Sequence, residues 1–133
     1  MLHWLYTFLL GPRYCERRFP CPACGFITLS EGGGGTYEIC SLCFWEDDSV
    51  QLDDPCHCGG ANGPSLLEWQ REVVLPQCPE SVLRFRGFDR AEGWRPICDA
   101  DLVHWQKNLL KHGDEVPDGM ITRYQYWHWK TEE

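Results

Sequence analysis

The sequence lacks the motifs of the common catalytic sites. It contains no HExxH motif, no glycine-rich phosphate loop and no arrangement of serine, histidine and acid that would activate a nucleophile. These absences exclude the familiar zinc proteases, P-loop enzymes and serine hydrolases. We therefore expect a protein that is not an enzyme.

Basic residues are scarce. The chain has 12 lysines and arginines against 20 aspartates and glutamates, which gives a formal net charge of −8. Such a charge repels phosphate backbones and attracts basic proteins, so nucleic acid is a disfavoured partner and a basic protein a favoured one.

Long hydrophobic runs are also missing. Residues 1–10 are apolar, but they are too few to cross a bilayer and lack the positive flank of a signal peptide. Nine cysteines make an odd number that cannot pair completely within one chain, which favours a reducing compartment. We expect a cytoplasmic protein without a membrane partner, in which residues 1–10 form a buried strand or short helix.

Two C-x-x-C pairs are the most informative feature of the sequence. Cys21 and Cys24 form the first pair, and Cys40 and Cys43 form the second. Four thiolates in two such pairs are the usual ligands of a tetrahedral zinc ion. Residues 26–29 and 36–39 have strand character around a glycine-rich turn, and a hairpin between them would bring the pairs together.

Other uses of these cysteines are less well supported by the pattern. A redox pair is expected at a strand-to-helix junction within a βαβ unit, and no such unit is visible. Iron suits the same four sulfurs, and the first pair also resembles that of rubredoxin, so spacing alone does not distinguish iron from the favoured zinc. With four metal-bound thiolates, the net charge becomes about −10.

The remaining pattern predicts a small α+β fold of one compact unit. A zinc-ribbon or knuckle hairpin is followed by amphipathic helices, and apolar strands from the two chain ends pack on it. Residues 1–20 form an apolar element and basic linker, 21–75 the metal module, and 76–133 a helical extension that ends in an aromatic strand. Ser65 and Glu68 form a capping box for a helix that should stop at Leu75-Pro76.

Three further elements are expected beyond that helix. Residues 81–88 mix arginines with aromatics and are interpreted as a short amphipathic element rather than a nucleic-acid grip. A second helix should run from Leu102 to Lys111, with residues 102, 106, 109 and 110 along one side. Residues 120–129 are rich in strand formers and could pair with residues 1–10.

Acidic and aromatic side chains are the candidates for partner binding. For the segment after Cys43, however, the favoured interpretation is structural, with its rings covering the metal site and its acids facing solvent. The candidate partner-binding residues are Trp45, Glu46, Asp47, Asp48, Asp53, Asp54, Trp127 and Trp129, with Asp99, Asp101, Asp114 and Glu115 as a second acidic group.

Residues outside the two pairs give a weaker metal signal. Cys56-His57-Cys58 could suggest a second site, but ligands one residue apart point in different directions and rarely hold one ion without a distant partner. Cys15, Cys78 and Cys98 have no assigned role.

Three motifs in order carry a family resemblance. CPACGFITL, TYEICSLCFWEDD and GGANGPSL closely resemble segments of the bacterial cysteine-rich CPCC family. Ala23 replaces the family's middle knuckle cysteine, which supports Cys21, Cys24, Cys40 and Cys43 as the ligand set. The resemblance implies a zinc-binding fold without an established activity.

Three functional hypotheses follow. Proteins similar to this family include small accessory proteins, and some resemble immunity proteins that accompany bacterial toxins. The first hypothesis is therefore a zinc-stabilised, acidic inhibitor of a toxin or another basic protein. The alternatives are a nucleic-acid-binding zinc ribbon and a rubredoxin-like iron redox protein.

Overall fold

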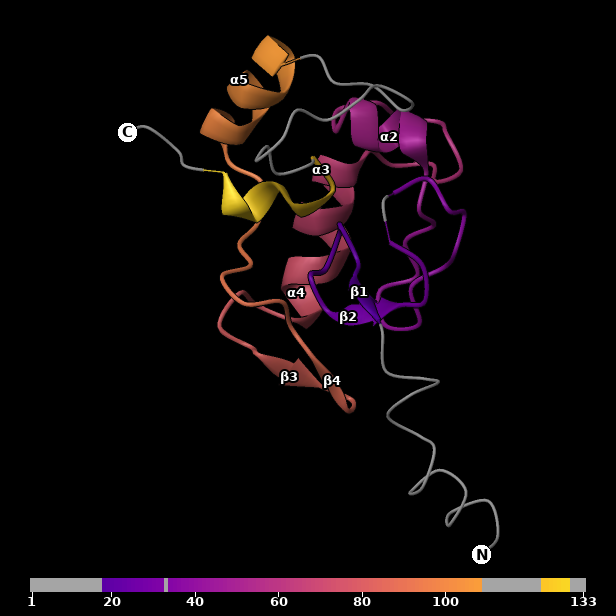
Figure 1. Ribbon diagram of the computed structural model, residues 1–133, viewed down its shortest axis with the longest axis vertical. Helices are drawn as coiled ribbons and strands as arrows, with labels where there is room; N and C mark the ends of the chain where they lie inside the picture. The colour runs from indigo at the N-terminus through magenta and orange to yellow at the C-terminus, as the bar shows by residue number, and fades with distance from the viewer. Residues whose placement is uncertain (1–17, 33, 109–122, 130–133) are drawn as a thin grey trace, which may run out of the picture.

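The computed structural model describes residues 18–32, 34–108 and 123–129. Two short antiparallel strand pairs and several helices surround the cysteine-rich segment, so the fold is small and α+β, as expected (Figure 1). In chain order the elements are β1 (Phe19–Pro20), β2 (Ile27–Leu29), α2 (Ser49–Asp53), α3 (Leu66–Trp69), the π-helix η1 (Gln70–Val74), α4 (Leu75–Gln77), β3 (Arg84–Phe85), β4 (Phe88–Asp89), α5 (Asp99–Asn108) and the 3-10 helix η2 (Arg123–His128).

Each cysteine pair lies in the turn of its own antiparallel pair of segments. β2 pairs with β1, and the first C-x-x-C turn connects them. Around the second turn, Ile39 pairs with Glu46. The predicted pairing of residues 26–29 with 36–39 is therefore wrong, because β2 directs its ladder hydrogen bonds to the preceding strand. The glycine-rich segment instead connects the two knuckles.

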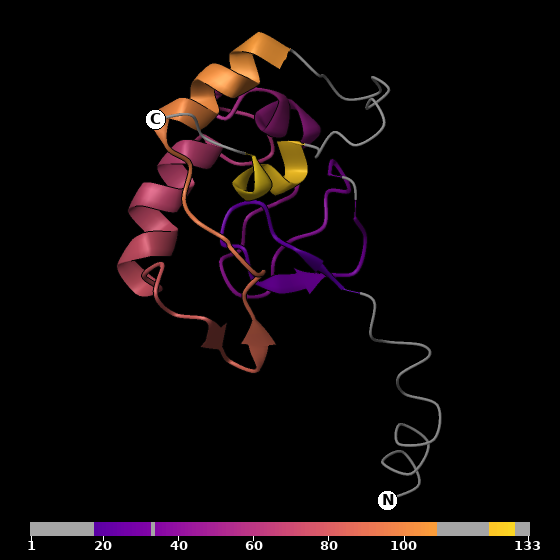
Figure 2. The same cartoon turned by 60° about the vertical axis from the view of Figure 1, so that its left-hand side comes forward.

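One continuous helix lies along the knuckles and consists of α3, η1 and α4 (Figure 2). Its capping box is confirmed, because the Ser65 hydroxyl accepts a hydrogen bond from the Glu68 amide and the Glu68 carboxylate accepts one from the Ser65 amide. The predicted stop at Leu75-Pro76 is slightly early, since the helix ends at Gln77. Pro76 lies in the first turn of α4, directly after η1, and proline is tolerated in the first turn of a helix.

Helix α5 begins at Asp99, earlier than the predicted Leu102. The Asp101 carboxylate accepts a hydrogen bond from the Cys98 amide at 2.9 Å, which supports the early start. The buried side chains are Asp101 and Trp105, whereas Leu102 is half-buried and Gln106 exposed. The predicted stripe is thus shifted by one position, and residues 109–111 lie outside the described residues.

The C-terminal aromatic segment is helical. The predicted strand is wrong, because residues 123–128 form η2. Tyr126 is fully buried, its hydroxyl donates to the Arg95 carbonyl at 2.6 Å, and its ring lies 5.4 Å from that of Trp105. The proposed pairing with residues 1–10 involves a segment outside the described residues.

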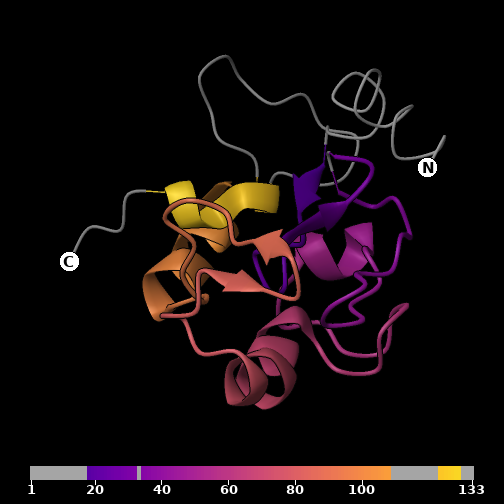
Figure 3. The same cartoon turned by 90° about the horizontal axis from the view of Figure 1, so that it is seen from below.

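Residues 81–88 contribute to a hairpin of β3 and β4 beyond the end of α4 (Figure 1, Figure 3). This hairpin joins the extension to the metal module, because Phe26 bridges Arg90 and the Ala91 amide donates to the Gly25 carbonyl at 2.7 Å. None of the helices in the described residues has the length and apolar character needed to span a bilayer.

Candidate metal centre

The four cysteines of the two C-x-x-C pairs converge on one point. All four Sγ atoms lie within 4.8 Å of one another, and the Cys21–Cys43 and Cys24–Cys40 sulfurs are each 3.7 Å apart. Sulfurs at the corners of a tetrahedron around zinc, each about 2.3 Å from the ion, are separated by about 3.8 Å. The donor set and its spacing therefore fit one tetrahedral metal ion.

The backbone of each knuckle explains this convergence. In the first, the Gly25 amide donates to the Cys21 carbonyl at 2.8 Å, and in the second the Phe44 amide donates to the Cys40 carbonyl at 2.9 Å. Both donors have positive φ, 79° at Gly25 and 68° at Phe44, which turns the chain tightly around the sulfurs. The two knuckles thus have the same local design.

The sulfurs are shielded from solvent and receive hydrogen bonds. Cys21, Cys24 and Cys40 are at most 1% exposed and Cys43 is 8% exposed. The Leu42 and Cys43 amides donate to the Cys40 sulfur at 3.4 and 3.5 Å. These bonds stabilise negative charge on the sulfur and hold it in place, as outer contacts do around metal ligands.

Without a metal ion, two thiols of this cluster have pKa values shifted in opposite directions. Burial raises the pKa of Cys21, because a thiolate loses hydration there. Hydrogen bonds from Cys21, Cys24 and Cys43 lower the pKa of Cys40 by stabilising its thiolate. A buried cluster of four thiolates requires a compensating cation, which a divalent metal ion provides.

Arg90 supports the first knuckle from the extension. It is only 6% exposed, and its Nε donates to the Cys24 carbonyl at 2.8 Å. Its Nη1 donates to both the Pro79 and the Val82 carbonyl, at 2.7 and 2.9 Å. Burial lowers the pKa of this guanidinium, but arginine remains charged at any ordinary pH. A cation therefore lies against the centre, where it counteracts the thiolate charge.

Gln70 connects the centre to the rest of the fold. Its fully buried side-chain amide donates to the Ala23 carbonyl at 3.0 Å and to the Tyr126 hydroxyl at 2.8 Å. Its carbonyl oxygen accepts from the Ile97 amide at 2.9 Å. Sequence reasoning missed Gln70 and Arg90. For Gln70 the only available signal was a polar position on an otherwise apolar helix face. For Arg90 it was an arginine between aromatic residues.

The acidic motif after Cys43 is largely structural. The expectation that its acids face solvent is wrong for Asp47 and Asp48, which are 1% and 5% exposed. Asp47 accepts from the Thr36 amide and hydroxyl at 3.0 and 2.9 Å. Asp48 caps α2 through the Val50 amide at 2.8 Å and accepts from the Ala61 amide at 2.7 Å. These carboxylates therefore fold the chain around the second knuckle.

A pair of buried amides fixes the loop that follows. The Gln51 side-chain oxygen accepts from the Asn62 backbone and side-chain nitrogens at 3.0 and 2.9 Å. Asn62 in turn accepts from the Glu46 amide at 2.9 Å and donates to the Glu46 carbonyl at 2.8 Å. Together with Asp48, these contacts join the FWEDD and GGAN motifs. Their resemblance to a family pattern thus has a physical basis in the fold.

The predicted partner-binding residues do not form one exposed face. Half of the eight residues are buried, and a buried side chain is not available to a partner. Trp45, Asp47, Asp48 and Trp127 are buried, Glu46, Asp53 and Trp129 are half-buried, and Asp54 is exposed. In the second acidic group, Asp101 is buried and bound to Arg95 and Asp99 is exposed, whereas Asp114 and Glu115 lie outside the described residues.

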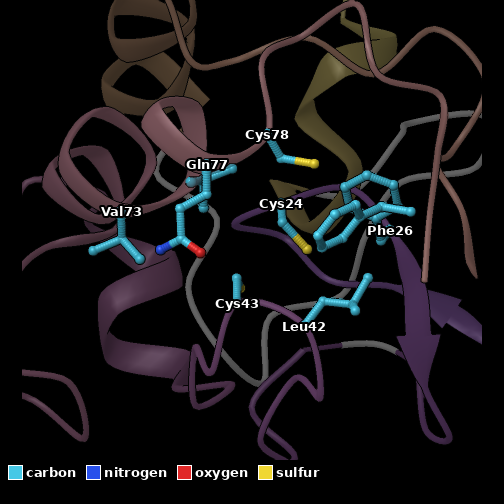
Figure 4. Close-up of a pocket in the computed structure, with 9 residues that line it drawn as sticks. Cys24, Phe26, Leu42, Cys43, Val73, Gln77 and Cys78 are labelled. Carbon is cyan, nitrogen blue, oxygen red and sulfur yellow. The ribbon is translucent and has the colours of Figure 1, made fainter.

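The other described cysteines are free thiols, and none joins the cluster. Cys56 and Cys58 are exposed, and the Cys58 thiol donates to the Glu68 carboxylate at 2.7 Å. Cys78 is buried and shares a small pocket with Cys24 and Cys43 (Figure 4). The pocket has about 20 Å³ of free space, which is room for one or two water molecules.

These features define the class of protein. It is a small α+β protein with a zinc-ribbon-like, four-cysteine metal-binding site. Residues 19–74 match the family described as Cysteine-rich CPCC, so this part of the chain is a cysteine-rich CPCC domain, as its three motifs indicated. No curated protein matches the chain.

Proposed function

We propose that the protein is a zinc-stabilised, non-enzymatic binding protein whose partner is a basic protein, such as a toxin that it inhibits. The observation that carries this proposal is the closed and buried arrangement of four cysteine sulfurs. Four thiolates complete a tetrahedral shell and leave no position for a substrate or an activated water. The metal ion therefore stabilises the fold, and function belongs to the surface.

Zinc is the ion we assign to the site. Bound there, it would be held by Cys21, Cys24, Cys40 and Cys43 and would supply structural cross-linking of the two knuckles rather than chemistry. The iron alternative is tested directly by elemental analysis and by colour. One zinc per chain in a colourless preparation supports the assignment, whereas stoichiometric iron with visible absorption contradicts it.

Charge supports a basic protein as the partner. The net charge of −8 speeds the approach of a cationic protein and slows that of a nucleic acid. Three arginines of segment 84–95 already bind groups within the chain. They are therefore less available to form the basic face that a nucleic-acid-binding zinc ribbon requires. Arg84 pairs with Asp89 at 2.6 Å, Arg90 holds backbone carbonyls, and Arg95 binds Asp101 at 2.7 Å.

The test is capture of a partner by the immobilised zinc-loaded chain, followed by mass spectrometry and measurement of the affinity at two salt concentrations. A stoichiometric basic protein whose binding weakens with salt is the expected result. Recovery of no stoichiometric partner contradicts the proposal. Salt-sensitive retention of DNA or RNA at physiological ionic strength would favour the nucleic-acid alternative instead.

A further inference from the structure

One position has the same backbone role in both knuckles but carries a different residue in each. Gly25 follows Cys24, and Phe44 follows Cys43, and both have positive φ. At Gly25 a side chain is excluded, because an added Cβ would lie 2.3 Å from the Trp94 ring. At Phe44 the ring is 66% exposed. The fold therefore does not require an aromatic side chain at position 44.

Phenylalanine at this position costs stability. Positive φ brings the Cβ of an ordinary residue close to its own backbone, and glycine or asparagine would remove this strain. An exposed aromatic ring adds little packing in return. A strained residue that is retained where glycine would serve the fold as well points to a functional role.

Tyr37 repeats this combination on the segment that leads into the same knuckle. Its φ is 61° and its side chain is 63% exposed. Ile39, two residues further along, is 56% exposed and pairs with Glu46 across the hairpin. Paired residues in an antiparallel ladder project side by side, so a half-buried carboxylate lies next to the exposed isoleucine.

We infer that Tyr37, Ile39, Phe44 and Glu46, the second-knuckle face, form the docking surface for an apolar segment flanked by arginine or lysine on a partner protein. This inference rests on the proposed function and names the surface that performs it. Aromatic side chains provide large contact area and stack on guanidinium groups, and a carboxylate beside them selects a positive charge. The net charge of −8 favours the same sign of partner.

The experiment uses a phage library of random 12-residue peptides, selected against the zinc-loaded full chain. Enriched peptides are synthesised, and their affinities are measured by fluorescence anisotropy for the wild type and four variants. Phe44→Asn and Tyr37→Asn keep a residue that tolerates positive φ but remove the rings. Val103→Ala is the matched control, because Val103 is 50% exposed on α5.

The expected result is enrichment of peptides that combine an apolar residue with arginine or lysine. Each asparagine variant should bind them at least tenfold more weakly, with unchanged zinc content and a melting temperature no lower than that of the wild type. Val103→Ala should bind as the wild type does. Glu46→Gln should weaken binding and reduce its salt dependence.

The possible failures separate the two proposals. Basic peptides that bind Phe44→Asn as tightly as the wild type would overturn the second-knuckle face and leave the proposed function standing. Peptides without basic residues that depend on Phe44 would overturn the basic partner and keep the face as a binding surface. Absence of any enrichment would count against both.

Discussion

Replacement of Gln70 by leucine should be among the most damaging single substitutions away from the metal ligands. Leucine has a similar volume, so packing changes little, but it can neither donate nor accept a hydrogen bond. The Ile97 amide and the Ala23 carbonyl would lose the partners that now lie 2.9 and 3.0 Å away. Each buried backbone group left without a partner costs about 1–3 kcal/mol, so we expect a total loss of about 2–6 kcal/mol.

Tyr126 should contribute little to this loss, because its hydroxyl still donates to the Arg95 carbonyl in the variant. The assay is urea denaturation of the zinc-saturated protein, with unfolding monitored by far-ultraviolet circular dichroism. Gln106→Leu is the matched control, since Gln106 is exposed on α5, and it should change stability by less than about 0.5 kcal/mol. A loss below about 1 kcal/mol for Gln70→Leu would refute the role assigned to this amide.

Three further predictions concern the same framework. Cys43→Ser should abolish stoichiometric metal binding, measured by elemental analysis, and the cooperative thermal transition, measured by circular dichroism. A variant that keeps both would contradict a structural metal centre. Asp48→Ala removes the cap of α2 and the acceptor of the Ala61 amide. It should lower the free energy of unfolding, measured by urea denaturation, by about 1–3 kcal/mol. The control Glu72→Ala, at an exposed helix position, should be nearly neutral. Arg90→Met leaves the Cys24 carbonyl without its donor and should cost about 3 kcal/mol, and Arg90→Lys should not restore the stability because an ammonium cannot reach several carbonyls at once.

The sequence predicted the parts of the fold that depend on local chemistry. The cysteine spacing identified the cluster, and the Ser65–Glu68 capping box marked the start of the long helix. Each C-x-x-C knuckle and the capping box arise within a few residues of chain. Their geometry is therefore nearly independent of the remaining fold.

Features that depend on distant contacts could not be predicted in this way. The C-terminal segment has strand propensity, but the burial of Tyr126 against Gln70 and Trp105 favours a 3-10 helix. The acidic run looks solvated, yet Asp47 and Asp48 satisfy amides that lie 11 and 13 residues away. Propensity does not report which partner a polar side chain finds in the folded chain.

The bond between Arg90 and the Cys24 carbonyl has a consequence for the order of folding. It spans 66 residues, whereas the second cysteine pair follows the first within about twenty positions. During synthesis on the ribosome, all four sulfurs emerge well before this arginine does. The nascent chain can therefore bind metal before the long loop between Cys24 and Arg90 closes. This order lowers the conformational entropy cost of closing that loop.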